Sequence, residues 1–155
     1  MIFYRPRFTT LVIVNRVTNS TRTPKPRIGL FMPFINRISI LSNRATTYKT
    51  KQTLMTNDKM VISVNISFMF KISNFEQIAI LRTSKQRYEH YRKMMQAIIA
   101  YSNNYLSELG AKEVFAMNMI DIREEPLISE LDKLGFELIR ITFIANPEES
   151  VSVRF

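Results

Sequence analysis

The sequence predicts an α+β fold: an antiparallel β-sheet meander packed by two or three helices, with a C-terminal return strand. Apolar residues recur at every second position through residues 60–72, which is the period of a strand. They recur at steps of three and four through residues 84–109, which is the period of a helix. A strand-like segment, residues 136–145, follows the helical part. With 155 residues, 46% of them hydrophobic, the chain can build one core.

The first half is expected to consist of strands and loops. Residues 9–17, 36–42 and 44–50 are expected to form strands. Residues 19–26 contain two prolines and are expected to form a loop, because proline removes a donor from the sheet. Residues 28–35, IGLFMPFI, are predicted to be an ordered loop pressed on a core.

The strand at residues 60–72 is predicted to bury one face. Its even positions, 60 to 72, are all apolar, whereas Ser63, Asn65, Ser67 and Lys71 are among the odd ones. Successive side chains of a strand point to opposite faces, so the even face is expected to lie in the core.

The second half is expected to be helical until its last strand. Asn74 is a candidate cap for a helix at residues 75–81, and Gly110 is expected to end the long helix. That long helix carries an apolar stripe that is expected to pack on the sheet: Tyr88, Tyr91, Met95, Ile98, Ser102, Tyr105, Leu106 and Leu109.

The remaining elements follow Gly110. A short helix is predicted at residues 111–116, and a helix within residues 121–134 that begins near Pro126. Its expected inner face is Ile128, Leu131 and Leu134, and Gly135 is expected to end it before the last strand. The resulting division is an N-terminal extension at residues 1–8, one domain at residues 9–145 and a C-terminal tail at residues 146–155.

The positive charge is concentrated in the first third of the chain. Residues 1–57 contain ten Lys and Arg side chains and no Asp or Glu, whereas the net charge of the whole chain is +9. This asymmetry favours contact with an anionic partner, although a solvated basic face has the same composition. Basic and aromatic side chains alternate here, and the following are predicted to form a docking surface: Phe3, Tyr4, Arg5, Arg7, Phe8, Arg16, Arg22, Lys25 and Arg27.

The sequence contains no residue pattern that is typical of a catalytic site or a cofactor site. The chain has no cysteine, which excludes disulfides and thiolate metal sites, and His90 is its single histidine. A catalytic histidine needs a nucleophile and an orienting acid that face it, and neighbouring positions on a helix do not face each other. His90 is therefore expected to be an exposed helical side chain. The three glycines are isolated and form no phosphate loop. We therefore predict no enzyme activity, no cofactor and no small-molecule substrate.

Three segments in order resemble the SPFH domain, also called band 7, of the stomatin, prohibitin and flotillin superfamily. They are GLFMPFINRISIL at residues 29–41, LMTNDKMVISVNISFMFKI at residues 54–72 and YLSELGAKEVFAMNMIDIREEPLISELDKLGFELIRITFI at residues 105–144. The resemblance covers roughly residues 10–145. The hydrophobic anchor that usually precedes this domain and the coiled coil that usually follows it are not found in this sequence.

The resemblance implies a structural subunit of a large membrane-associated assembly, whose partners are other protein subunits and anionic lipid headgroups. High use of Phe, Tyr, Met, Ile, Asn and Lys, which have AT-rich codons, favours a mitochondrially encoded subunit of an inner-membrane respiratory complex. Without an anchor of its own, the chain would be attached by other subunits. Two alternatives remain: a self-assembling membrane scaffold of the prohibitin and stomatin type, and an RNA-binding subunit of an organellar ribosome. RNA is the less favoured partner, because no platform of aligned aromatic side chains accompanies the charge.

Overall fold

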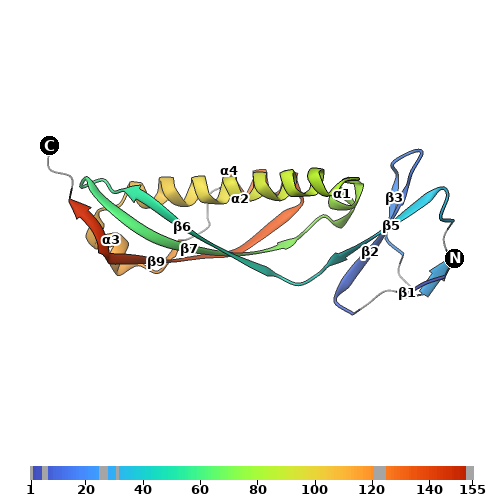
Figure 1. The fold of residues 1–155 in the computed structure, drawn as a ribbon, viewed down its shortest axis with the longest axis horizontal. Coiled ribbons are helices and arrows are strands. Elements are labelled where there is room, and N and C mark those ends of the chain that lie inside the picture. The colour runs from blue at the N-terminus through green and yellow to red at the C-terminus, as the bar shows by residue number, and fades with distance from the viewer. Residues whose placement is uncertain (1, 5–6, 25–27, 31, 121–124, 153–155) are drawn as a thin grey trace.

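The protein is elongated, with a small sheet at one end and a larger sheet, covered by a long helix, along the rest (Figure 1). The structure, a computed structural model, describes residues 2–4, 7–24, 28–30, 32–120 and 125–152.

The strands divide into three antiparallel sheets, with the orders β1-β4, β3-β2-β5 and β6-β7-β9-β8. The sequence therefore correctly predicts antiparallel strands packed by helices. Their bounds are β1 Ile2–Tyr4, β2 Thr9–Asn15, β3 Thr21–Arg22, β4 Ile28–Leu30, β5 Asn36–Ser42, β6 Thr46–Met55, β7 Met60–Ile72, β8 Met119–Ile120 and β9 Phe136–Ser152.

Four helices occur in the described ranges: α1 Phe75–Ile80, α2 Ser84–Ser107, α3 Ala111–Ala116 and α4 Glu125–Leu134. None of them combines the length and the apolar character that crossing a bilayer requires. Helix α2 begins at a capping box in which Thr83 accepts from the amide of Gln86 and the Gln86 side chain accepts from the amide of Thr83. The cap fixes where the long helix starts.

Strand β7 is the centre of the four-stranded sheet and carries its core. It pairs with β6 along residues 46–55 and with β9 along most of its own length. Its even positions from Ile62 to Ile72 are buried, as the alternation predicts, and Met60 is half-buried against the same core. Helix α2 covers this inner face with Met94, Ile98, Ser102 and Leu106.

The small three-stranded sheet joins the same core through α1. Val12 and Val14 of β2 and Leu41 of β5 belong to one apolar cluster with Ile78 and Ala79 of α1. Strand β2 is also buried on its opposite face, where Leu11 and Ile13 pack with Ile38 in a second small cluster. A strand buried on both faces reads as a continuous apolar run, which explains LVIV at residues 11–14.

Two stretches of the chain differ from the sequence predictions. The side chains of Met32, Phe34 and Ile35 are exposed, so this part of residues 28–35 does not press on a core. Strand β9 continues to Ser152, where the sequence analysis ended it at residue 145, because the register shifts and the residues between Asn146 and Val151 bulge opposite β7. A proline is tolerated at such a bulge, since no ladder donor is required there.

The helix faces are rotated slightly from the predicted ones. Tyr88 is 62% exposed, and Met94, not Tyr91 or Met95, is the fully buried side chain at that level of α2. On α4, Leu127 and Leu131 are buried while Ile128 is exposed. Because a helix stripe slants across the axis, small errors in the assumed period move the inner face by about one residue.

His90 is not the exposed side chain that the sequence predicts. Its Nε2 lies 2.6 Å from the carbonyl oxygen of Leu134, and its ring packs 5.7 Å from the ring of Phe136. Gly135 follows with a φ of +79°, a conformation that glycine adopts without a steric penalty, and its carbonyl accepts from Ser73 and Asn74. His90 therefore helps to fasten the α4–β9 corner to α2, which is a structural role.

Asp58 connects the β6–β7 turn to α3. Its carboxylate accepts the amide of Ala111 at 3.1 Å and the hydroxyl of Thr56 at 2.5 Å. The hydrogen bond from Thr56, followed by that from Ala111, lowers the pKa of the Asp58 carboxyl. Ionised Asp58 thus holds the first residue of a six-residue helix that has few contacts of its own.

Ile66→Asp is expected to lower the free energy of unfolding by several kcal/mol, because it places an unpaired charge in an apolar interior. Ile66 is 1% exposed at the centre of β7. Urea unfolding monitored by circular dichroism measures the change. The matched control is Asn65→Asp, the same new residue one position earlier on the exposed face, which should unfold close to the parent. Equal stability of the two variants would contradict the assignment of faces.

Asp58→Asn is expected to destabilise the protein at neutral pH but not in acid. A carboxyl whose pKa is lowered by folding stabilises the fold above its unfolded pKa of about 3.9, and this contribution is lost as pH falls toward the folded value. Thermal melts of parent and variant should therefore differ at pH 7 and converge as pH falls below about 4. Asp132→Asn, on the exposed face of α4, serves as control. A gap that stays constant down to pH 3 would refute the linkage.

Candidate functional site

Two turns lie side by side at one end of the three-stranded sheet. The amide of Arg16 donates to the carbonyl of Ile35 at 2.7 Å, and the amide of Asn36 donates to the carbonyl of Met32 at 2.8 Å. Residues 15–20 and 32–36 therefore form one surface, here called the sheet tip. The side chain of Asn15 accepts from the amides of Val17 and Thr18, which holds the first turn in shape.

The sheet tip exposes large apolar side chains to solvent. Val17 is 81% exposed, Met32 65% and Phe34 91%. Ile35 beside them is also exposed. Large apolar side chains exposed on neighbouring turns in this way are typical of surfaces that contact a protein or a membrane.

Four arginines converge next to the sheet tip: Arg16 after β2, Arg37 on β5, and Arg82 and Arg87 around the start of α2. Arg37 donates to the carbonyls of Ala79 at 2.6 Å and of Arg82 at 3.1 Å. These contacts place a cation at the C-terminal end of α1, where it offsets the helix dipole. Arg82 in turn donates to the Asn19 side chain at 2.5 Å.

Like charges face one another in this arginine cluster. Burial, and then the positive charges of Arg87, Arg82 and Arg16, lower the pKa of Arg37. The two ion pairs found between described residues, Lys71 with Glu137 and Arg92 with Glu89, lie elsewhere. Glu76, the acidic side chain of α1, is hydrogen-bonded to Thr21 instead. The cluster therefore keeps excess positive charge, which attracts anions.

A hollow of about 180 Å³ opens within the arginine cluster, lined by Val14, Arg16, Asn19, Arg37 and Arg82. A second hollow of about 410 Å³ lies at the same end of the sheet and is lined by Ile13, Asn15, Ser20, Thr21, Arg22, Ile35 and Asn36. The end of the three-stranded sheet is thus concave, and it combines the basic side chains of the arginine cluster with the apolar side chains of the sheet tip.

The structure separates the docking residues that the sequence predicts. Arg16 and Arg22 lie at the sheet tip and next to it. Arg7 and Phe8 precede β2 and lie at its opposite end, roughly 25 Å away at about 3.3 Å of rise per residue. Phe8 there sits 4.5 Å below the guanidinium of Arg44. The predicted surface is therefore at least two surfaces.

Five predicted docking residues have no described side chain. Phe3 and Tyr4 belong to β1, whose backbone pairs with Gly29 and Ile28 of β4. Arg5, Lys25 and Arg27 lie outside the described residues.

Sequence reasoning missed part of the site. Arg82 and Arg87 follow α1, far along the chain from the basic first third, and reach the cluster only because α1 packs on β2. Phe34 and Val17 were missed as exposed anchors. Phe34 lies in a segment assigned to the core, although Pro33 beside it favours a turn.

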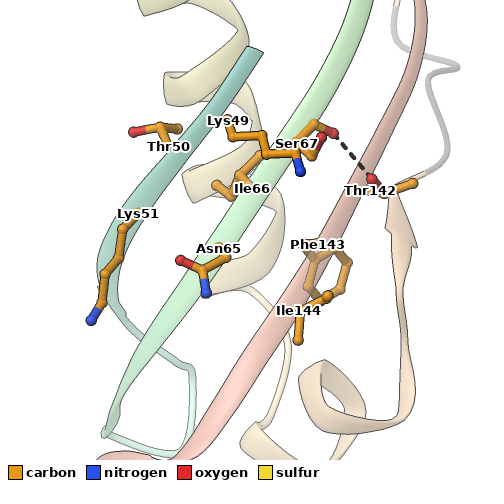
Figure 2. A pocket seen from close by; sticks show the side chains of 9 residues that line it. All are labelled: Lys49, Thr50, Lys51, Asn65, Ile66, Ser67, Thr142, Phe143 and Ile144. Carbon is orange, nitrogen blue, oxygen red and sulfur yellow. Dashed lines mark hydrogen bonds between the residues drawn. The ribbon is translucent and has the colours of Figure 1, made fainter. Parts of the chain in front are cut away.

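An open hollow of about 540 Å³ lies on the outer face of the four-stranded sheet, where Lys49, Asn65, Ser67, Thr142 and Ile144 are among its lining residues (Figure 2). The Thr142 hydroxyl donates to the carbonyl of Ser67 at 3.2 Å. Lys49 and Ser67 are cross-strand partners, and so are Ser67 and Thr142. Among the described residues that line this hollow, no hydrogen bond joins a nucleophile to a base.

In the described ranges, no three His, Cys, Asp or Glu side chains lie close enough together to be a candidate set of metal ligands.

Comparison with known proteins agrees with this picture. The SPFH domain / Band 7 family matches residues 10–153. Proteins of this family are membrane-associated, generally non-catalytic scaffolds that typically form oligomeric assemblies with other proteins. No curated protein matches the chain. Because the match spans nearly the whole chain and the fold has the sheets and helices that the resemblance implies, the protein belongs to the SPFH domain / Band 7 family.

Proposed function

We propose that this chain is a non-catalytic, prohibitin-like structural subunit of a large membrane-associated assembly, and that its sheet tip meets the anionic membrane surface. The observation that carries the proposal is the pairing of exposed apolar side chains with arginines at one end of the molecule. Apolar side chains enter the boundary between headgroups and acyl chains, while arginines stay at the level of the phosphates.

The magnitudes favour reversible contact. Full burial of a Phe side chain such as Phe34 is worth about 1.5–3 kcal/mol. Each basic side chain near an anionic membrane adds about 1 kcal/mol. A few such contacts bring a subunit to the surface and orient it. The oligomeric assemblies typical of the family would strengthen such contacts by bringing several tips to one surface, which supports placing the chain in a complex.

A mitochondrial inner-membrane setting, in a respiratory complex, is the part of the proposal that rests on composition alone. The preference for residues with AT-rich codons supports an organellar gene.

RNA is a weaker candidate partner than lipid or protein. Proteins that bind single-stranded RNA stack bases on several aligned aromatic side chains. At the sheet tip one aromatic side chain, Phe34, is described, and it stands beside aliphatic ones. This arrangement suits an apolar boundary better than a row of bases.

Phe34→Ser is expected to weaken binding to vesicles that contain anionic phospholipid by roughly tenfold or more, because the lost burial removes most of one anchor. Sedimentation of the purified protein with phosphatidylcholine vesicles, with and without phosphatidylglycerol, measures the binding. Ile144→Ser is the matched control, since Ile144 is 69% exposed on the four-stranded sheet, away from the tip. Equal binding by both variants would remove the sheet tip from the membrane.

The assembly itself is tested by isolating the tagged chain from gently solubilised membranes of its native host. We expect particles much larger than 18.2 kDa that contain other proteins and that persist from about 50 to 500 mM salt, a range that screens exposed charge pairs. Particles of this chain alone would instead indicate a self-assembling scaffold. Dissociation by ribonuclease would indicate a ribosomal subunit.

A further inference from the structure

We propose that the hollow in the arginine cluster is a binding site for one phosphate group. The hollow of about 180 Å³ has the size for a single tetrahedral anion and its first hydration, and guanidinium groups approach it from β5, from the turn after β2 and from the α1–α2 connection. Arginine presents fixed N–H donors that match phosphate oxygens in pairs, so three arginines around one concavity are suited to this ligand.

The arginines of the site have two roles: some are held by backbone carbonyls, and the others are available to bind the ligand. Arg37 is engaged with the carbonyls of Ala79, Ile80 and Arg82, so one side of its guanidinium is committed to the end of α1. Arg87 likewise donates to the carbonyl of Leu81 at 3.2 Å. These contacts hold Arg37, which lines the hollow, and the neighbouring Arg87 in place without any ligand.

Arg16 and Arg82 are the arginines available to bind the ligand. Arg82 spends one NH2 group on the Asn19 side chain and, at 3.5 Å, on the carbonyl of Arg16. Both residues are exposed, and within the described ranges neither forms an ion pair with a carboxylate. Both side chains line the concavity.

A dianion satisfies this cluster better than a carboxylate does. Three cations, Arg87, Arg82 and Arg16, lie close enough to influence Arg37, and a single carboxylate offsets one of these charges. A phosphate monoester carries between about one and a half and two negative charges at pH 7 and offers three acceptor oxygens. The preferred ligand class is therefore a phosphate monoester or inorganic phosphate, whether free or on a lipid headgroup.

This inference does not require the membrane contact proposed above, but it is compatible with it. Arg16, which lines the hollow, donates its amide to the carbonyl of Ile35, so the hollow adjoins the sheet tip. If those side chains enter a bilayer, the arginines come to the level of the lipid phosphates.

The test is a titration of the purified protein with inorganic phosphate at constant ionic strength, kept constant with chloride. Ligand that binds only the folded state raises the melting temperature, by roughly 3–6 °C for each tenfold excess over the dissociation constant in a protein of this size. Isothermal calorimetry gives the affinity. We expect saturable binding to one site, weakened roughly tenfold or more by Arg16→Gln and again by Arg82→Gln, because each removes charge-assisted hydrogen bonds.

Arg140→Gln is the matched control, since it removes the same charge from an exposed position on β9. It should leave phosphate binding unchanged. In phosphate-free, low-salt buffer, Arg16→Gln should melt at or above the parent temperature, because it relieves repulsion within the cluster. A loss of phosphate binding together with a retained or raised melting temperature distinguishes a lost site from a damaged fold. Non-saturable shifts, or equal shifts in all three variants, would overturn the proposal.

Vesicles distinguish the source of the phosphate. If lipid supplies it, vesicles with phosphatidic acid, a monoester, should bind the parent more tightly than vesicles with phosphatidylglycerol, a diester, and Arg16→Gln should remove the difference. If the parent binds inorganic phosphate but neither vesicle, the phosphate site stands with a free ligand and the membrane contact fails. If vesicles bind through Phe34 and are indifferent to Arg16→Gln and Arg82→Gln, and the parent shows no saturable binding of inorganic phosphate, the membrane contact stands and the phosphate site fails.

Discussion

The double pairing of β7 is the constraint on which the rest of the structure depends. Hydrogen bonds to β6 on one side and β9 on the other fix its register over nearly its whole length. A slip of one residue would turn Ile66 and Phe68 to solvent and Asn65 and Ser67 into the core. Since α2 packs on the inner face that this register defines, the position of the long helix follows from the position of one strand.

Much of the fold could be predicted because its signals are local and repeated. The alternation in residues 60–72 continues for the full strand, and Thr83 with Gln86 marks the start of α2 within a few residues. Where the signal is short or is overridden by tertiary pairing, prediction failed. Strand β8 has only two residues and pairs with β9, and β9 continues past residue 145, its predicted end, by means of a bulge.

The site was less predictable because it is assembled from distant segments. Positive charge in the first third pointed to Arg16, but two of its neighbours in the cluster are distant in sequence: Arg82 in the α1–α2 connection and Arg87 in α2. No composition count reveals that Arg37 is committed to the carbonyls of a helix that begins almost forty residues later. The exposure of Phe34 is equally hard to predict from the sequence. Phe34 has the apolar character of a core residue, and the structure shows that the adjoining turn leaves it exposed to solvent.

The length of α2 sets a distance. The helix runs along the long axis from the three-stranded sheet to the end that holds α3 (Figure 1), and its twenty-four residues span about 36 Å. Because its buried side packs on β7, the helix resists bending more than an isolated helix would. A contact at α3 is therefore separated by several nanometres from a contact at the sheet tip. The two ends of the domain are therefore far enough apart for a contact at one end not to reach a contact at the other.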